Sequence, residues 1–368
     1  MIRGSMTVEP TSAASGACVG DLLRRRDWSG LQNYFAHRAP KSAEDFEARA
    51  MLSLGTRPDV QGAQAAAQDL QQACRMQPEN ALLAANLAQS LLDCGQAQAA
   101  EGSVRAALQR MPPHATLVEK LALALAALSR WDASLAQTQR SLSAVWPAGL
   151  GPSTALQQLD RELSSRWWRP LDIGGARLRL ACEGDASFVK ATFDDPSFMR
   201  RYHRFQATDD AAVQQWLGRA LLRPMHTRRC EWLVIDRTGA ATGLAGLVDI
   251  DMANRRAELV VGLSRPDPSG ALAFKAAVGV MHMAFDRFGL HKLTSYVYGD
   301  NALAQHNTLR LGLQQEGLLN EHIDGGQGYV DLYVNGLLSR AYRSDARLQR
   351  LVRRWCAADL QTSWPTAV

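Results

Sequence analysis

Paired cysteines are what the sequence most clearly lacks. Its six cysteines form no CxxC pair, and none has a histidine at the spacing of a metal site. This pattern argues against a disulfide scaffold and against structural zinc, and it suits the reducing cytoplasm. We therefore expect a cytoplasmic protein without a bound metal. The cysteines are Cys18, Cys74, Cys94, Cys182, Cys230 and Cys356.

Long apolar runs and strong net charge are missing as well. No run reaches the roughly 18–20 apolar residues that span a bilayer, and no signal peptide is visible. The formal net charge of +5 is modest and comes largely from arginines spread along the chain, so neither a membrane nor a nucleic acid is an expected partner. The opening MIRGS looks like a vector remnant, and we expect residues 1–19 to be flexible.

Alanine, leucine and glutamine dominate residues 20–146, where β-branched residues are scarce. This composition predicts an all-α domain. Within it a step of 34 residues links Pro78 to Pro112, and the same step links Ala66 to Ala100 and Ser134. A repeat of this length predicts stacked helical pairs. The full length of 368 residues leaves room for a second domain.

The central unit of this period resembles a tetratricopeptide repeat. Gly95 permits the turn between two helices, and Pro112 ends the second helix. The resemblance implies a concave surface that binds a peptide or protein partner. The sequence leaves open that the repeats only pack on a neighbour or form a homodimer. The matching positions are Leu87, Ala88, Leu91, Gly95, Ala100, Val104, Ala107 and Pro112.

A turn-rich stretch, PAGLGP at residues 147–152, separates this domain from the rest. Residues 154–168 then predict one amphipathic linker helix, with Leu156, Leu159 and Leu163 on its inner face. Trp167 and Trp168 at its end are expected to make an interdomain contact. We place the linker at 147–172.

The chain is organised around residues 246–313, whose pattern is hairpin, loop, helix, strand and helix. Strands are expected at 243–250, 257–263 and 292–298, and helices at 272–288 and from 301 onward. The loop that opens the first of these helices could receive an anion, because a helix start offers free N–H groups and the positive end of the dipole.

Motifs in the second half resemble those of GNAT acetyltransferases of the ribosomal-protein N-acetyltransferase type. They are DDPSFMR at 194–200, NRRAEL at 254–259, DN to GL at 300–313, EG and EH at 316–322, and YVDLY to GLL at 329–338. The resemblance covers residues 173–343 and implies an α/β mixed sheet. The rest, 344–368, is expected to be a basic helix and tail. The basic helix runs over 340–354 and is expected to dock through Leu348, Leu351 and Trp355.

The family resemblance implies transfer of an acetyl or other acyl group from acyl-CoA to a primary amine of a protein, an amino sugar or a small molecule, with no metal. Glu258 is then the candidate general base, although it could instead be a structural carboxylate bonded to Arg255 or Arg256. The family polarises the thioester carbonyl with a main-chain N–H where two parallel strands part, here within 260–263.

The donor site implied by the resemblance departs from the family pattern. Leu272 replaces the second glycine of the pyrophosphate loop, Ser269 replaces an arginine, and Asp267 adds a negative charge. Thr308 stands where many members have a tyrosine acid, and His306 is expected to face solvent. The implied donor-binding residues are Val261, Leu263, Arg265, Ser269, Gly270, Ala271, Leu272 and Asn301.

On the acceptor side the candidate substrate contacts are Tyr202, His203, Glu321 and His322. Three hypotheses follow from the sequence: an acyl-CoA-dependent N-acyltransferase, a catalytically degenerate scaffold, and an N-acyltransferase that accepts its acyl group from a carrier protein.

Overall fold

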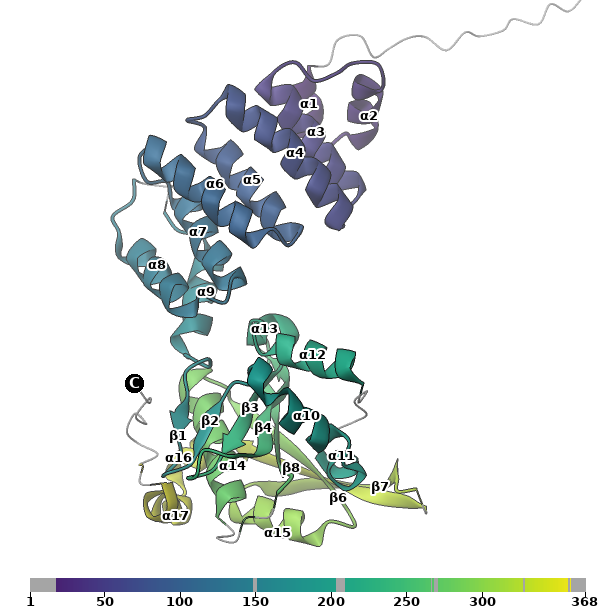
Figure 1. Ribbon diagram of the computed structural model, residues 1–368, viewed down its shortest axis with the longest axis vertical. Coiled ribbons are helices and arrows are strands. Elements are labelled where there is room, and N and C mark those ends of the chain that lie inside the picture. The colour runs from purple at the N-terminus through teal and green to yellow at the C-terminus, as the bar shows by residue number, and fades with distance from the viewer. Residues whose placement is uncertain are drawn as a thin grey trace, which may run out of the picture. The chain divides into compact units, whose positions relative to one another are not determined.

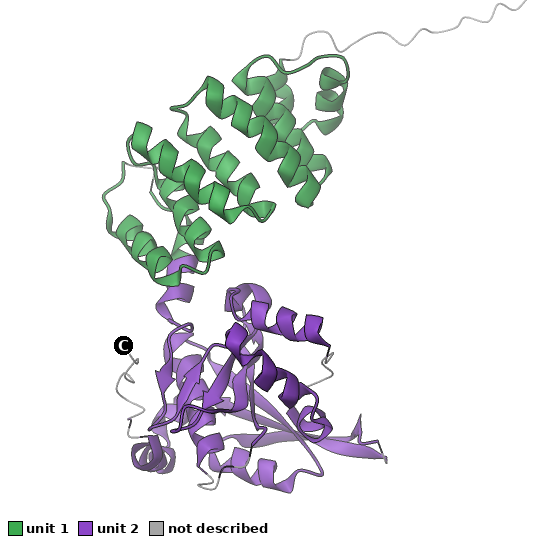
Figure 2. Ribbon diagram, in the orientation of Figure 1, with its two compact units in different colours: residues 1–157 green, residues 158–368 purple. Residues whose placement is uncertain are grey.

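The computed structural model describes residues 18–147, 151–202, 209–265, 267, 271–326, 328–356 and 358. The chain divides into two compact units, residues 1–157 and 158–368 (Figures 1 and 2). The division falls inside helix α9, Thr154–Ser164, within the stretch that the sequence indicated as a linker. Each unit has its own core.

The first unit is helical, and each helix from α3 to α8 contacts the next along the chain. Helices α5 and α7 begin 34 residues apart, at Ala81 and Ala115, and so do α6 and α8, at Ala97 and Trp131. The predicted period is therefore present in the helices themselves. Its elements are α1 Val19–Arg24, α2 Trp28–Ala36, α3 Ala43–Thr56, α4 Val60–Met76, α5 Ala81–Asp93, α6 Ala97–Arg110, α7 Ala115–Ala127 and α8 Trp131–Ser143.

Small residues form much of this unit's core, which is what close helix packing requires. Ala88, Ala100 and Val104 are completely buried, and Gly95 takes a φ of +77° in the turn between α5 and α6. The arrangement is the one a tetratricopeptide-like repeat would produce; its assignment to that family stays a prediction.

The second unit is built on one eight-stranded sheet with strand order β1-β2-β3-β4-β5-β6-β8-β7. Among the described strands, β5 and β6 alone run parallel; all other neighbours are antiparallel. The strands are β1 Leu171–Asp172, β2 Arg177–Arg179, β3 Cys230–Ile235, β4 Ala241–Asp251, β5 Arg256–Leu263, β6 Lys292–Tyr298, β7 Gln314–Asp324 and β8 Tyr329–Leu338.

Helices cover both faces of this sheet. One face packs on α10, α11 and α12 through a cluster that includes Leu233 and Ile235 of β3. Helix α14 lies on the other face. Val234 points to the face opposite Leu233 and Ile235, and Leu178 of β2 shares that face because it pairs with Val234. A Cβ at Gly279 of α14 would meet Leu178, so α14 packs there. The helices are α10 Ala186–Phe193, α11 Pro196–Tyr202, α12 Asp210–Arg219, α13 Pro224–Thr227, α14 Leu272–His282, α15 Ala302–Arg310, α16 Ser339–Ser344 and α17 Ala346–Cys356; η1 Glu183–Asp185 is a 3₁₀ turn and η2 Met283–Arg287 a π-helical turn.

The predicted fold class, a helical repeat-like first half and an α/β mixed sheet in the second, is confirmed. Three predicted helices differ in detail. The helix at 340–354 is two helices, because Asp345 has a ψ of 96° and its carboxylate caps α17 through the N–H groups of Arg347 and Leu348. The helix at 272–288 ends in the π-helical turn, and the linker helix ends at Ser164.

The two adjacent tryptophans lie beyond the end of α9. Trp167 is buried and meets Trp168 edge-on, and its backbone oxygen accepts a hydrogen bond of 2.9 Å from the Trp232 indole of β3. Trp167 is therefore part of the second unit's own core.

Candidate active site

The sheet opens between its two parallel strands. Pairing of β5 with β6 stops at Glu258 and Thr294, although β5 runs on to Leu263 and β6 to Tyr298. Beyond Glu258 each strand still pairs with its antiparallel neighbour but no longer with the other. The facing backbone edges between the strands can therefore bind the amide groups of an extended ligand. This is the divergence expected at 260–263.

A cleft of about 880 Å³ follows this opening. Its volume falls in the range of small-molecule sites. Glu258 and the end of β5 form its base, and the first turns of α14 and one side of α15 form its walls. Helix α11 contributes the wall nearest Glu258, through Phe198 and Tyr202. One cleft thus holds a carboxylate, the free strand edges and a helix start.

The arginines beside Glu258 have other partners. Arg255, at a φ of +53°, donates from its guanidinium to the Gly289 backbone oxygen at 2.9 and 2.7 Å. Arg256 pairs with Asp251 at 3.4 Å. The NRRAEL motif therefore holds the β4–β5 turn and the loop before β6, and it places Glu258 at the point where the strands part.

Tyr202, a predicted acceptor contact, does line the cleft. Its ring stacks on Phe198 with centroids 4.9 Å apart, and both rings lie against Gly262, where a Cβ would come within 2.7 Å of Tyr202. Burial, with the Glu231 charge next, raises the pKa of the Tyr202 phenol well above its usual range. The phenol therefore stays neutral at physiological pH.

At the start of α14, where the family resemblance predicts the pyrophosphate, a carboxylate of the chain itself is bound. The Leu272 backbone N–H, at the start of α14, donates to Asp267 Oδ2 at 2.7 Å. The Leu272 side chain is buried and does not line the cleft, so the side chain itself does not block the helix start. Asp267 takes the position that an anionic ligand would take at a helix N-terminus.

Five of the predicted donor residues line the cleft: Val261, Leu263, Arg265, Ala271 and Asn301. The Arg265 guanidinium lies over the Phe188 ring, 5.5 Å from its centroid. Asn301 also caps α15 by accepting from the Ala304 N–H at 3.2 Å. Ser269 and Gly270 lie outside the described residues, as does His203 on the acceptor side.

The remaining predicted residues lie elsewhere or play a different part. Glu321 and His322 are exposed on β7 at a bulge, outside the cleft lining, and Glu321 has a φ of +47°. His306 is exposed on α15, whereas Thr308 is buried and lines the cleft. Substrate contact by Glu321 and His322 stays a prediction.

Sequence reasoning missed several cleft residues. Tyr296 and Tyr298 of β6 and Arg310 of α15 line it, and so does Trp355 of α17. Alternation along β6 could have indicated the tyrosines. Nothing in the sequence could have shown that α17, which follows α15 only after two further strands and a short helix, returns to this cleft.

Among the described residues, no group of three or more His, Cys, Asp or Glu side chains could hold a metal ion, and none of the helices combines the length and the apolar character of a membrane span.

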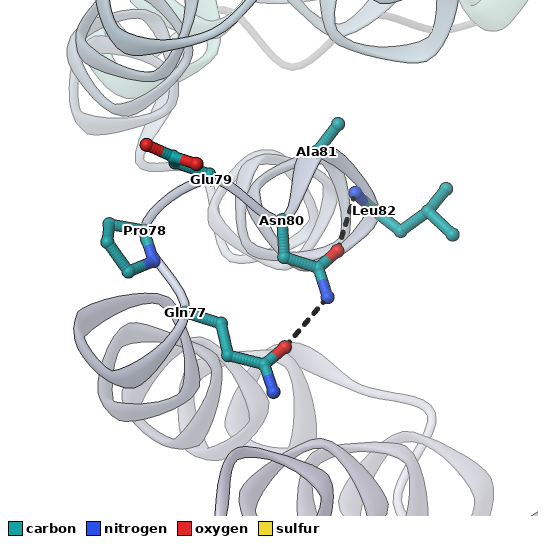
Figure 3. Close-up of a pocket in the computed structure, with 6 residues that line it drawn as sticks. All are labelled: Gln77, Pro78, Glu79, Asn80, Ala81 and Leu82. Atoms are coloured by element: carbon teal, nitrogen blue, oxygen red, sulfur yellow. Dashed lines mark hydrogen bonds between the residues drawn. The ribbon is translucent and has the colours of Figure 1, made fainter.

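A second hollow lies in the first unit, at the turn between α4 and α5 (Figure 3). There Asn80 caps α5 by accepting from Leu82 N–H at 3.1 Å, and it donates to Gln77 at 2.9 Å. The polar side chains of this turn are thus bonded to one another.

Comparison with known proteins points to one enzyme class. Residues 176–314 match the acetyltransferase (GNAT) domain model. Spermidine N(1)-acetyltransferase of Escherichia coli K12 is 28% identical over 160 residues, which is 43% of this chain and 78% of that protein. An uncharacterized N-acetyltransferase p20 of Bacillus licheniformis is 26% identical over 110 residues, 30% of this chain and 62% of that protein.

Solved structures with a similar arrangement include spermidine N-acetyltransferase from Vibrio cholerae in complex with CoA and spermine. That structure has a TM-score of 0.42 and 20% identity, and the match covers 46% of this chain and 98% of that chain. A putative acetyltransferase from T. thermophilus has a TM-score of 0.42 and 19% identity, covering 50% and 96%.

The matched segment contains the parted strands, Glu258, the start of α14 and α15. GNAT acetyltransferases use acetyl-CoA as the acetyl donor. The second unit therefore carries a GNAT acetyltransferase domain, and the protein is an enzyme that transfers an acetyl group from acetyl-CoA to an amine.

Proposed function

We propose that Glu258 is the general base of this transfer and that the acceptor amine reaches it along helix α11. The carrying observation is that one cleft joins the Glu258 carboxylate to the parted edges of β5 and β6 and to the start of α14. A thioester seated between the strands would have its carbonyl beside the free β5 backbone and its attacking amine beside Glu258.

The chemistry requires a neutral amine. Glu258, directly or through a water, takes a proton from the ammonium form, and the amine nitrogen attacks the thioester carbon. The C–N bond forms and the C–S bond breaks. A backbone N–H within 260–263 stabilises the oxyanion between these events. As the intermediate collapses to the amide, the nitrogen gives up its second proton to solvent, and the thiolate of CoA leaves and takes up a proton from solvent.

For the acceptor we propose a small cationic amine. Two observations support this class over a protein amine or an amino sugar. Beside α11 the cleft lining holds two carboxylates, Asp195 and Glu258, and one arginine, Arg201, whose charge is paired with Asp300 at 3.8 Å. The Escherichia coli relative is named for acetylation of spermidine. Opposite charge at the mouth of a cleft attracts a cation before it binds.

The test is turnover with acetyl-CoA and three acceptors: spermidine, a peptide with a free N-terminus, and glucosamine. We expect the spermidine kcat/KM to exceed the other two at least tenfold. Calorimetry with acetyl-CoA alone, as the independent arm, should show saturable binding below about 1 mM, the upper end of common KM values. Absence of both binding and turnover would overturn the function; a preference for the peptide would overturn only the acceptor.

A second candidate concerns the donor. Asp267 at the start of α14 opposes a pyrophosphate by like charge, which favours a donor without one. An acyl group on the phosphopantetheine arm of a carrier protein is such a donor. Comparing kcat/KM for acetyl-CoA and an acetylated carrier protein separates the two, since a carrier-dependent enzyme would turn over the carrier at least tenfold better.

For the first unit we propose a separate role. We propose that its helical repeat binds a protein or peptide partner, which is supported by the 34-residue period of its helices. A pulldown that compares the full chain with residues 158–368 checks this proposal. We expect a partner bound by the full chain to be lost from residues 158–368; a partner retained by residues 158–368 would contradict the proposal.

A further inference from the structure

Helix α17 lies outside the matched segment, yet it forms part of the same cleft. Residues 176–314 end before it begins at Ala346. Its Leu351 and Trp355, one helical turn apart, both line the cleft. Trp355 is 36% exposed, a large fraction for an indole on a helix that buries several of its other apolar side chains. This helix is therefore a wall that the matched domain does not supply.

The position of α17 is fixed at both ends and along its inner face. A Cβ at Gly312, after α15, would lie 3.1 Å from the carboxylate of Asp345, so α17 starts beside the end of α15. Its far end rests on the turn between β1 and β2, where a Cβ at Gly174 would meet the Trp355 backbone oxygen. Leu348, Val352 and Cys356 are buried on its inner face.

The charge of α17 is of one sign. Its sequence, ARLQRLVRRWC, contains four arginines and no acidic residue. Arg347 precedes Leu351 by one turn and so lies on the cleft side. Arg354 holds its guanidinium 5.6 Å from the Trp355 ring centroid. Arg310 of α15 also lines the cleft. The inner apolar face is already buried, so α17 has no apolar stripe to offer a membrane surface.

Acetyl-CoA is an elongated molecule with a thioester at one end and an adenosine 3′-phosphate at the other. With the thioester at Glu258 and the pyrophosphate at the start of α14, the nucleotide must continue along α14. The cleft lining includes Ala273, Phe274 and Ala277 of α14, and it also includes Arg310 of α15 and Trp355 of α17. We propose that α17 forms the nucleotide subsite of the donor, with adenine stacked on Trp355 and the 3′-phosphate bound by Arg310 and Arg347. This rests on the proposed donor chemistry.

The proposed nucleotide subsite supplies the positive charge that the pyrophosphate loop lacks, since Ser269 stands there in place of an arginine. An aromatic face stacks any base, and arginine pairs with phosphate through two N–H groups. These contacts offset the repulsion from Asp267 without touching it. They also separate the donors, because a carrier protein brings no adenosine to this subsite.

Calorimetry tests the subsite with three probes: CoA, dephospho-CoA without the 3′-phosphate, and pantetheine without the nucleotide. Trp355→Ala should raise the Kd of CoA and of dephospho-CoA about tenfold, within the range for losing one base–aromatic stack, and leave pantetheine unchanged. Arg347→Ala should weaken CoA several-fold but not dephospho-CoA. Arg353→Ala, on the side of α17 opposite Leu351 by helical spacing, is the matched control and should match wild type.

Each outcome decides something. Wild-type affinity for CoA in Trp355→Ala, with saturable binding in the unmodified chain, would overturn the subsite alone. Equal weakening of all three probes would mean that α17 only supports the fold, and would also overturn it. Failure of the unmodified chain to bind CoA at all would overturn the donor assignment on which it rests.

Discussion

The two ends of the cleft differ in what fills them: the end at Glu258 is left open between two strands, whereas the end at the start of α14 holds a carboxylate of the chain. At the acyl end the strands part after Glu258, and the surrounding motif residues hold that opening in place. At the phosphate end a carboxylate of the chain bonds the first N–H of α14, where the donor's anion belongs. The comparison shows that catalytic geometry and donor affinity are set by separate parts of one cleft. Each can be changed without the other.

The largest effect is expected at the acyl end. Glu258→Gln keeps the side-chain shape but cannot accept the amine proton, so kcat should fall about 100-fold or more. Steady-state turnover with acetyl-CoA and spermidine measures it, with thermal unfolding as the check on folding. The matched control is Glu183→Gln, an exposed glutamate outside the cleft lining, which should keep wild-type kcat. Unchanged turnover in Glu258→Gln would remove this residue from the mechanism.

The wall beside Glu258 should be the next most sensitive. Gly262→Ala places a Cβ within 2.7–3.0 Å of the Tyr202 and Phe198 rings and so forces α11 away from β5. Overpacking of this kind costs about 1–3 kcal/mol of unfolding free energy. Denaturant unfolding of the second unit measures it. Gly218→Ala in α12, where a Cβ meets nothing within 4 Å, should not destabilise; equal losses in both variants would contradict the packing argument.

At the phosphate end the expected change is a gain. Asp267→Asn still offers an oxygen to the Leu272 N–H but removes the negative charge, so the Kd of CoA should fall about three- to tenfold, or about 1 kcal/mol. Calorimetry at low salt measures it. Asp210→Asn makes the same charge change at the start of α12 and should leave the Kd unchanged. Weaker binding in Asp267→Asn would show that its carboxylate assists the donor.

The smallest effect concerns the support of the sheet rather than the cleft. Arg179 pairs with Asp185 at 2.7 Å and lowers the pKa of that carboxyl from 3.8 to about 2. Because the folded pKa is depressed, its stabilisation is complete above pH 4 and is lost as the pH falls towards 2. Allowing for solvent screening, Asp185→Asn should lower the unfolding free energy by about 0.5–1 kcal/mol at pH 7.

Urea denaturation at several pH values provides the readout. The gap between wild type and Asp185→Asn should narrow as the pH drops from about 4 to 2. A gap that stays constant across this range would mean that the ion pair does not set the acid response.

Periodic and local signals were enough to predict most of the fold. The strand at 292–298 has the predicted bounds, and the motif around Glu258 placed this residue where the strands part. Features that depend on a single backbone angle or on distant packing were not predictable. The break at Asp345 needs one residue outside helical ψ, and the return of Trp355 to the cleft depends on contacts with α14 and α15. Asp267 was noticed as a charge, but its bond to Leu272 is a matter of three-dimensional geometry.

The three residue pairs between β5 and β6 have a consequence for motion. They join two antiparallel halves, β1–β5 and β6–β8, and β5 and β6 each have more residue pairs with their antiparallel neighbours, β4 and β8, than with each other. Local opening is favoured where few backbone hydrogen bonds connect two cooperative blocks. A donor lying between the strands would bridge this seam with its own amides. Amide hydrogen exchange along the inner edges of β5 and β6 should therefore slow on CoA binding, while exchange between β3 and β4 stays as it was.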